Sequence, residues 1–65
     1  MVIFKKNGVE NGKSAYLVQR KAIGSKFSFA SIAFDGSDWV LRRLPNGRVD
    51  RFERLEDAKQ EARKS

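Results

Sequence analysis

The sequence predicts a small α+β domain, in which an antiparallel sheet of about four to five strands is followed by one C-terminal helix packed on one face. Three observations support this fold class. Asn-Gly and Asp-Gly dipeptides, which tolerate positive φ and favour tight turns, divide the chain. Runs rich in β-branched and aromatic residues lie between them, and helix-forming residues begin at Leu55. The turn dipeptides are Asn7-Gly8, Asn11-Gly12, Asp35-Gly36 and Asn46-Gly47.

The strands are expected in the runs between these turns, which are residues 2–6, 14–21, 26–34, 39–44 and 48–53. A connector that contains Gly24 separates the second run from the third. The third run is apolar on both faces, since Phe27 and Phe29 share one face while Ile32 and Phe34 share the other. This pattern is typical of a central strand, or of a strand with a bulge partway along.

The fourth and fifth runs predict a hairpin around Pro45-Asn46-Gly47. Proline suits the first position of a three-residue loop, with Gly47 in the left-handed conformation. This loop places Leu44 opposite Arg48, whereas a two-residue turn would pair different residues, and both remain open. In the three-residue register, one face holds Val40, Arg42, Leu44, Arg48, Asp50 and Phe52, and the other holds Trp39, Leu41, Arg43, Val49, Arg51 and Glu53.

A helix is predicted over residues 55–64, where nearly all residues are good helix formers. Leu55, Ala58 and Ala62 form one narrow apolar stripe. A helix of about ten residues is marginal in isolation, so we expect it to dock on the sheet through this stripe. Arg54 is a poor N-cap, because Ser, Thr, Asp and Asn are preferred there.

Length and composition exclude most catalytic chemistry. The 65 residues form one domain, residues 1–65, which is too small for a deep pocket around a small-molecule substrate. The chain has no cysteine and no histidine, and therefore lacks thiolate metal sites and the commonest general base. We expect no enzymatic activity, no metal and no cofactor.

The sequence contains no recognisable targeting segment. Only Met1 and three further apolar residues precede Lys5, whereas a secretory signal needs an apolar stretch of about 7–15 residues. No run reaches the roughly 20 apolar residues of a membrane span. These features predict a cytoplasmic protein without membrane contact, and Met1 with the polar C-terminal end leads us to expect a complete reading frame.

The charge predicts a nucleic-acid partner, with DNA favoured over RNA. Fourteen Lys and Arg residues outnumber eight Asp and Glu residues, which gives a net charge of +6 and a pI near 10.2. Arginines gather on the predicted hairpin, where their planar forks suit phosphate and guanine edges. In the expected register, Trp39, Arg43 and Arg51 share one face and read a groove, while Arg48 holds phosphate. The candidate contact residues are Trp39, Arg42, Arg43, Arg48, Arg51 and Arg54, with Lys5 and Lys6 extending the positive surface.

Each of these assignments has a structural alternative. Arg42 and Asp50 would form a cross-strand ion pair in the same register. Trp39 is equally compatible with a place in the core. The lysines near the N-terminus are also typical of a charged strand edge that blocks aggregation. The apolar surplus of residues 27–34 favours a different function, that of a small protein-binding modulator or inhibitor, acting through a sheet face or edge and forming a homodimer or a heterocomplex.

Residues 39–62 also resemble a family of DNA-binding domains. The resemblance rests on Trp39, on Gly47-Arg48 in the hairpin, on Phe52, and on Leu55-Glu56-Asp57-Ala58 at the start of the helix. In this pattern the chain is similar to AP2-like domains, which include the amino-terminal arm-binding domains of phage and transposon integrases. The resemblance implies that a sheet face lies in the major groove, with contacts from Trp39, Arg43 and Arg51, and that Phe52, Leu55 and Ala58 belong to the core. It implies an accessory or regulatory protein of phage or plasmid type.

Overall fold

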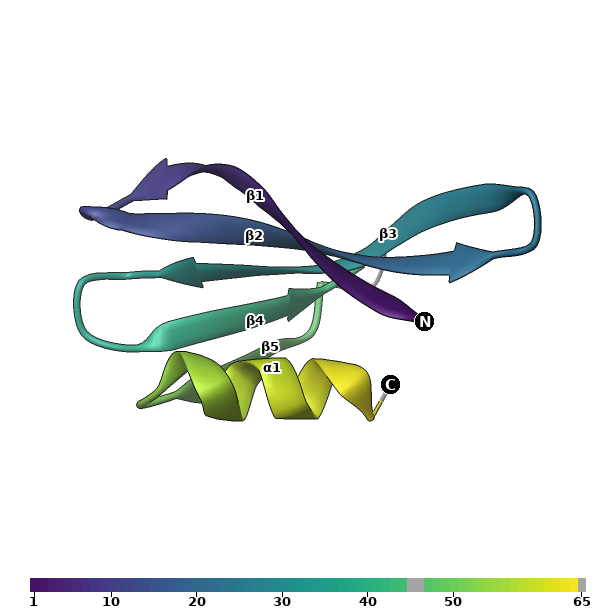
Figure 1. Cartoon of the computed structure of the whole chain (residues 1–65). Coiled ribbons are helices and arrows are strands. Elements are labelled where there is room, and N and C mark those ends of the chain that lie inside the picture. Colours follow the sequence, from purple (N-terminus) through teal and green to yellow (C-terminus); the bar gives the residue numbers. More distant parts are fainter. Residues whose placement is uncertain (45–46, 65) are drawn as a thin grey trace.

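The computed structural model describes residues 1–44 and 47–64, which form a five-stranded antiparallel sheet with one helix packed against it (Figure 1). The strands are paired in chain order, so β3 is central and the edges are β1 and β5. This arrangement confirms the predicted α+β fold class. The elements are β1 (Val2–Glu10), β2 (Lys13–Ala22), β3 (Ser25–Phe34), β4 (Trp39–Arg43), β5 (Val49–Phe52) and α1 (Leu55–Arg63).

The two Asn-Gly dipeptides near the N-terminus have different structural roles. Asn11 and Gly12 both adopt positive φ, at 52° and 79°, and form the tight turn between β1 and β2. Asn7 and Gly8 instead lie within β1, where the pairing register shifts between Lys6 and Val9. Gly8, with φ of 84°, therefore supplies a bulge rather than the predicted turn, which is why β1 is longer than expected.

A bulge in β3 gathers its apolar side chains on one face. Val18 pairs with Ala30 and Gln19 pairs with Ser28, so Phe29 is the extra residue on β3. Beyond the bulge, Arg20 pairs with Phe27. Because Val18 and Arg20 share a face of β2, their partners Ala30 and Phe27 also share a face. The predicted bulge and central position of this strand are confirmed, and the expectation of two separate apolar faces is wrong.

The core lies between this face of the sheet and α1. Ala58 and Ala62 are small, so the helix lies close to Ile32 and Leu41, which are fully buried. We call the side that carries Ile32 and Leu41 the helix face, and the opposite side the open face. The core is completed by Val18 and Ala30, and it is flanked by the partly buried residues Val2, Phe4, Tyr16, Phe29, Trp39, Phe52 and Leu55.

The helix begins at Leu55, as predicted, and ends at Arg63, one residue short of prediction. Arg54, at the N-cap position, has an extended backbone and makes no capping hydrogen bond through its side chain. Glu56 and Asp57 lie in the first turn and complement the helix dipole. Among the described residues, no helix is both long and apolar enough to cross a membrane.

The packing predicts where mild truncation destabilises the fold. Ile32→Val removes one methylene group from a fully buried side chain, and the free energy of unfolding should fall by about 0.5–1.5 kcal/mol in urea denaturation. Val9→Ala is the matched control, because Val9 is 70% exposed and its truncation should change stability by less than about 0.5 kcal/mol. Equal losses in the two variants would contradict this core assignment.

Candidate nucleic-acid interface

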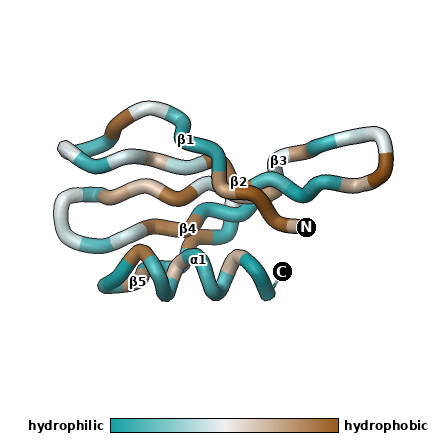
Figure 2. The backbone as a smooth tube through the Cα atoms, viewed as in Figure 1, coloured by the Kyte–Doolittle hydropathy of each residue, from teal (hydrophilic) through white to brown (hydrophobic). Residues whose placement is uncertain are grey.

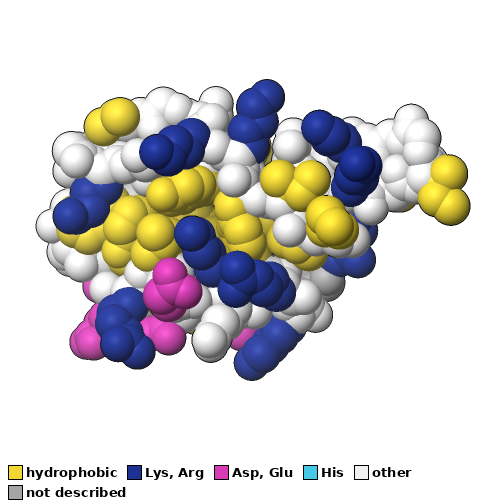
Figure 3. Space-filling view, in the orientation of Figure 1, with side chains coloured by type: hydrophobic (Ala, Val, Ile, Leu, Met, Phe, Trp, Pro, Cys, Tyr) yellow, Lys and Arg dark blue, Asp and Glu magenta, His cyan; other side chains and the backbone are white. Residues whose placement is uncertain are grey.

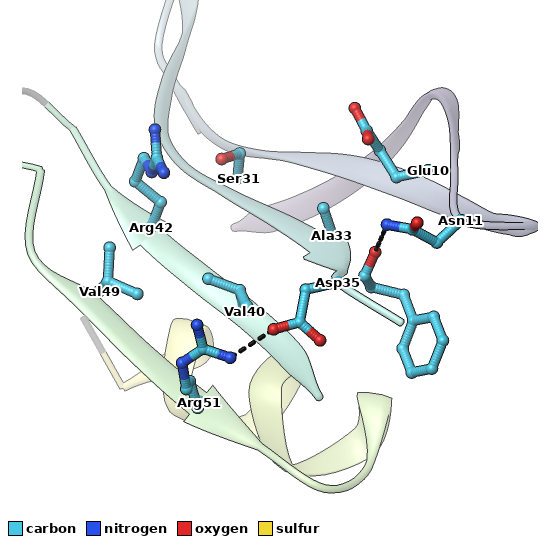
Figure 4. A pocket seen from close by; sticks show the side chains of 10 residues that line it. Glu10, Asn11, Ser31, Ala33, Asp35, Val40, Arg42, Val49 and Arg51 are labelled. Carbon is cyan, nitrogen blue, oxygen red and sulfur yellow. Dashed lines mark hydrogen bonds and ion pairs between the residues drawn. The ribbon is translucent and has the colours of Figure 1, made fainter. Parts of the chain in front are cut away.

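The open face carries a row of side chains that no described element covers. Ser31 pairs with Arg42, and Arg42 pairs in turn with Val49. One step along the strands, Val40 pairs with Arg51. Cross-strand partners project to the same side of a sheet, so these residues share the open face. They line a hollow, which Figure 4 shows from the side opposite the helix, together with Glu10, Asn11, Ala33, Phe34 and Asp35.

The turn between β3 and β4 holds Arg51 over this hollow. The Oδ1 atom of Asp35 accepts hydrogen bonds from the backbone N–H groups of Ser37, at 2.9 Å, and Asp38, at 2.7 Å. Its Oδ2 atom pairs with the guanidinium of Arg51, which also lies 3.6 Å from a carboxylate oxygen of Asp38. The N–H groups of Asp38 and Ser37, followed by Arg51, lower the pKa of Asp35 to about 2. Arg51 is therefore anchored, while its side chain remains 60% exposed.

The register of β4 and β5 differs by one residue from the prediction. The backbone N–H of Arg43 donates to the carbonyl of Arg48, at 2.8 Å, next to the ends of the two strands. Leu41 pairs with Asp50, and the predicted pairing of Leu44 with Arg48 is wrong. Gly47 has the predicted left-handed conformation, with φ of 74°. Pro45 and Asn46, on which the predicted loop chemistry rests, lie outside the described residues.

This register separates the three predicted groove-reading residues. Arg43 lies on the helix face, only 19% exposed, where it pairs with Asp50 and with Glu61 of α1 at 3.4 Å. Trp39 also lies on this face, packed against the core, with its ring centroid 5.2 Å from that of Phe34. Placing Trp39 and Arg43 on one face with Arg51 is thus wrong. Asp50 pairs with Arg43 and not, as the alternative had it, with Arg42.

The other predicted contact residues lie in several places. Lys5 pairs with Leu17 and belongs to the open face, whereas Lys6 pairs with Tyr16 and belongs to the helix face. Arg48 is exposed at the end of the hairpin, and its Nε atom lies 3.9 Å from Oδ2 of Asp50. Arg54 is exposed before α1, 3.6 Å from Asp57. Of the predicted set, the open face brings together Lys5, Arg42 and Arg51.

Acidic neighbours balance most of the arginines in the hairpin. Arg43, Arg48, Arg51 and Arg54 each have a carboxylate within 4.0 Å. Arg42 is exposed and forms no ion pair with any residue that the structure describes. Residues 35–65 contain eight basic and seven acidic residues, whereas residues 1–34 contain six basic residues and only Glu10 as an acid. The excess positive charge therefore belongs to β1, β2 and β3.

Two further cations complete the open face. Lys21 pairs with Lys26 near the end of the β2–β3 hairpin, and alternation along β2 places both on the same side as Gln19. Sequence analysis did not single out Lys26, because no arginine or aromatic cluster marks it. The alternation of side chains along residues 26–34 would place Lys26 on the open face, provided that the extra residue at the bulge is taken into account. Neutral hydrogen-bonding groups lie between these lysines and Arg42, namely Gln19, Ser28 and Ser31.

Comparisons with protein-family models, with curated proteins and with solved structures found no match to this chain. The resemblance to AP2-like domains therefore remains a prediction, although Phe52, Leu55 and Ala58 do contribute to the core, as it implied. Within residues 1–44 and 47–64, no three metal-ligating side chains gather closely enough to hold a metal ion.

The free energy of unfolding at acidic pH should depend on the ionisation of Asp35. Because its pKa is lowered from 3.8 to about 2, its ionised form stabilises the fold above about pH 4, and this contribution is lost as the pH falls towards 2. Asp35→Asn should therefore lose less stability than the wild type between pH 4 and pH 2, as measured by urea denaturation. Arg51→Ala should keep most of the wild-type dependence, since the backbone N–H groups lower the pKa more than Arg51 does. Identical profiles for Asp35→Asn and the wild type would refute this assignment.

Proposed function

We propose that this protein is a non-enzymatic DNA-binding accessory or regulatory protein, and that its open face contacts duplex DNA. One observation carries the proposal. Five cationic side chains project from a sheet face that no described element covers, and neutral hydrogen-bonding groups lie among them. Electrostatic attraction to phosphates supplies most of the affinity in such interfaces, while hydrogen bonds to base edges supply the specificity. The five are Lys5, Lys21, Lys26, Arg42 and Arg51.

The three strands that carry Ser31, Arg42 and Arg51 match the width of the major groove. Neighbouring strands lie about 4.8 Å apart, so the axes of β3 and β5 are separated by about 10 Å. The major groove of B-DNA is about 12 Å wide. Arg42 lies on β4, midway between these strands, where a guanidinium can reach the O6 and N7 atoms of guanine. Arg51 lies on the edge strand β5, nearer to a phosphate.

The affinity should depend strongly on salt. If four or five phosphates are neutralised, log K should fall with log salt concentration at a slope of about −4. Arg42→Ala should weaken duplex binding, with a slope smaller by about 1 if Arg42 contacts phosphate, or with relaxed specificity if it contacts a base. Fluorescence anisotropy at several salt concentrations, with single-stranded DNA and RNA in parallel, measures both quantities.

Two arginine variants are matched controls for this experiment. Arg54→Ala removes another exposed charge, which lies beside Asp57 of α1 and away from the open face, and it should leave the slope unchanged. Arg43→Ala should lower stability, because Asp50 and Glu61 lose their partner, but it should also leave the slope unchanged. Absence of duplex binding at low salt, binding without salt dependence, or an equal effect of Arg54→Ala and Arg42→Ala would each refute the proposed interface.

A second candidate function rests on the uncovered part of the helix face. The helix lies over β4 and β5, and aromatic side chains remain partly exposed beside it. Figure 3 shows this apolar band between the upper strands and the helix, crossed by Lys and Arg side chains. Four of the rings have a cation above them: Lys59 over Phe4 and Tyr16, Arg63 over Phe4, Arg20 over Phe29, and Lys13 over Phe34, all at 5.0–5.6 Å.

This pattern favours an acidic partner protein over a homodimer. A second copy on the same face would bring Lys59 and Arg20 close to like charges, which is unfavourable. A segment with apolar and acidic side chains would bury the rings and pair with the cations. We expect random peptides selected on the protein to be rich in Glu, Asp and apolar residues, and Lys59→Glu combined with Arg63→Glu to reverse the charge preference. A concentration-dependent dimer in sedimentation, or selected peptides without acidic bias, would argue against this candidate.

A further inference from the structure

The β2–β3 hairpin extends beyond the rest of the sheet as an arm, which we define as residues 21–28. Pairing with β1 ends at Arg20, and pairing with β4 ends at Ala30. Within the arm, Lys21 pairs with Lys26 and Ala22 pairs with Ser25, while Phe27 and Ser28 pair with the last residues of β2 before it, Arg20 and Gln19. One further hydrogen bond, from the backbone N–H of Lys21 to the carbonyl of Met1 at 2.9 Å, joins the base of the arm to the N-terminus. All residues of the arm are exposed. Figure 1 shows the arm projecting past the neighbouring strands, which is consistent with a longest dimension of 37 Å against 20 Å in the other two directions.

The tip of the arm presents an apolar side chain where a polar one is usual. Ile23 is fully exposed, more so than any other large hydrophobic residue that the structure describes. Figure 2 shows hydrophobic colouring at this tip, far from the core. Tight hairpin turns favour Asn, Asp, Gly or Ser, and Gly24, with φ of 79°, already supplies the positive φ. Ile23 therefore serves neither the core nor the turn.

The charges on the arm favour an anionic ligand. Lys21 and Lys26 are direct cross-strand partners, an arrangement in which like charges repel. No acidic residue occurs between Asn11 and Phe34 to offset them. A polyanion that contacts both lysines would relieve the repulsion. A fully exposed apolar tip flanked by two lysines matches side chains that wedge between base pairs from the minor groove while cations hold the phosphates.

The distance from Arg42 to the arm fits the geometry of DNA. Arg42 pairs with Ser31, which pairs in turn with Leu17, and Ile23 lies six residues beyond Leu17 along the chain. At about 3.3 Å per residue this separation is about 20 Å, comparable to half a turn of about 17 Å. One turn of the duplex is about 34 Å, so half a turn separates a major groove from the next minor groove. With Arg42 in the major groove, the arm reaches the adjacent minor groove.

We infer that Ile23 inserts as an apolar wedge between two base pairs in the minor groove, while Lys21 and Lys26 hold the flanking phosphates, and that the duplex bends as a result. This inference rests on the proposed function, because it presupposes that the open face binds duplex DNA. Wedges of this kind kink a duplex by about 20–90°. The minor groove is only about 6 Å wide, so it must widen where Ile23 inserts.

The test combines duplex binding with a measurement of bending. Energy transfer between dyes at the two ends of a short duplex should rise when the wild-type protein binds. Ile23→Ser should bind with an unchanged salt slope, because both lysines remain, but should leave the duplex nearly straight. Ile23→Leu should restore bending. Val9→Ser is the matched control, because Val9 is another exposed apolar residue in the sheet and its change should leave bending as in the wild type.

Different outcomes distinguish a failure of the wedge from a failure of DNA binding itself. No duplex binding by the wild type at low salt overturns both. Binding without bending, or bending that Ile23→Ser leaves intact, overturns the wedge and leaves the DNA-binding function in place. Vesicles of equal parts phosphatidylcholine and phosphatidylglycerol probe an anionic membrane instead. If the wild type binds them, Ile23→Ser does not, and DNA bending is absent, the arm is a membrane contact and the wedge is refuted.

Discussion

The extra residue that β3 inserts at Phe29 determines what each face of the sheet can do. With the bulge, Phe27, Ala30 and Ile32 lie on the side that receives α1, and Ser28 and Ser31 lie on the other. Without it, residues 27–34 would divide their apolar side chains between the two faces. The single core against α1 therefore depends on this local irregularity.

Positive and negative charges are distributed unevenly over the molecule. Five of the seven carboxylates in residues 35–61 lie beside arginines, namely those of Asp35, Asp38, Asp50, Asp57 and Glu61, so that part of the protein is nearly neutral. The strands β1, β2 and β3 have almost no acidic residues and carry the excess positive charge. The cations of these strands lie on both faces, with Lys5, Lys21 and Lys26 on the open face and Lys6 and Arg20 on the helix face. On the open face, Arg42 extends the positive surface toward the hairpin.

The two faces permit two kinds of contact at once. The open face combines cations with neutral hydrogen-bonding groups, a composition that suits a groove of nucleic acid. The uncovered part of the helix face combines aromatic rings with the stems of Lys59, Arg63 and Arg20, which shield apolar surface from water. Because these surfaces lie on opposite sides of one thin sheet, a partner on one side leaves the other free.

The fold class, the order of the elements and the start of the helix at Leu55 could be predicted from the sequence, because they depend on turn residues, side-chain periodicity and helix propensity within short segments. The availability of each arginine could not be predicted in this way, because it depends on contacts between distant parts of the chain. A shift of one residue between β4 and β5 moves every side chain of one strand to the opposite face relative to the other strand. In addition, ion pairs such as that of Arg43 with Glu61 join residues far apart in the chain. Neither the closing pair of a hairpin nor a distant carboxylate is visible in local sequence.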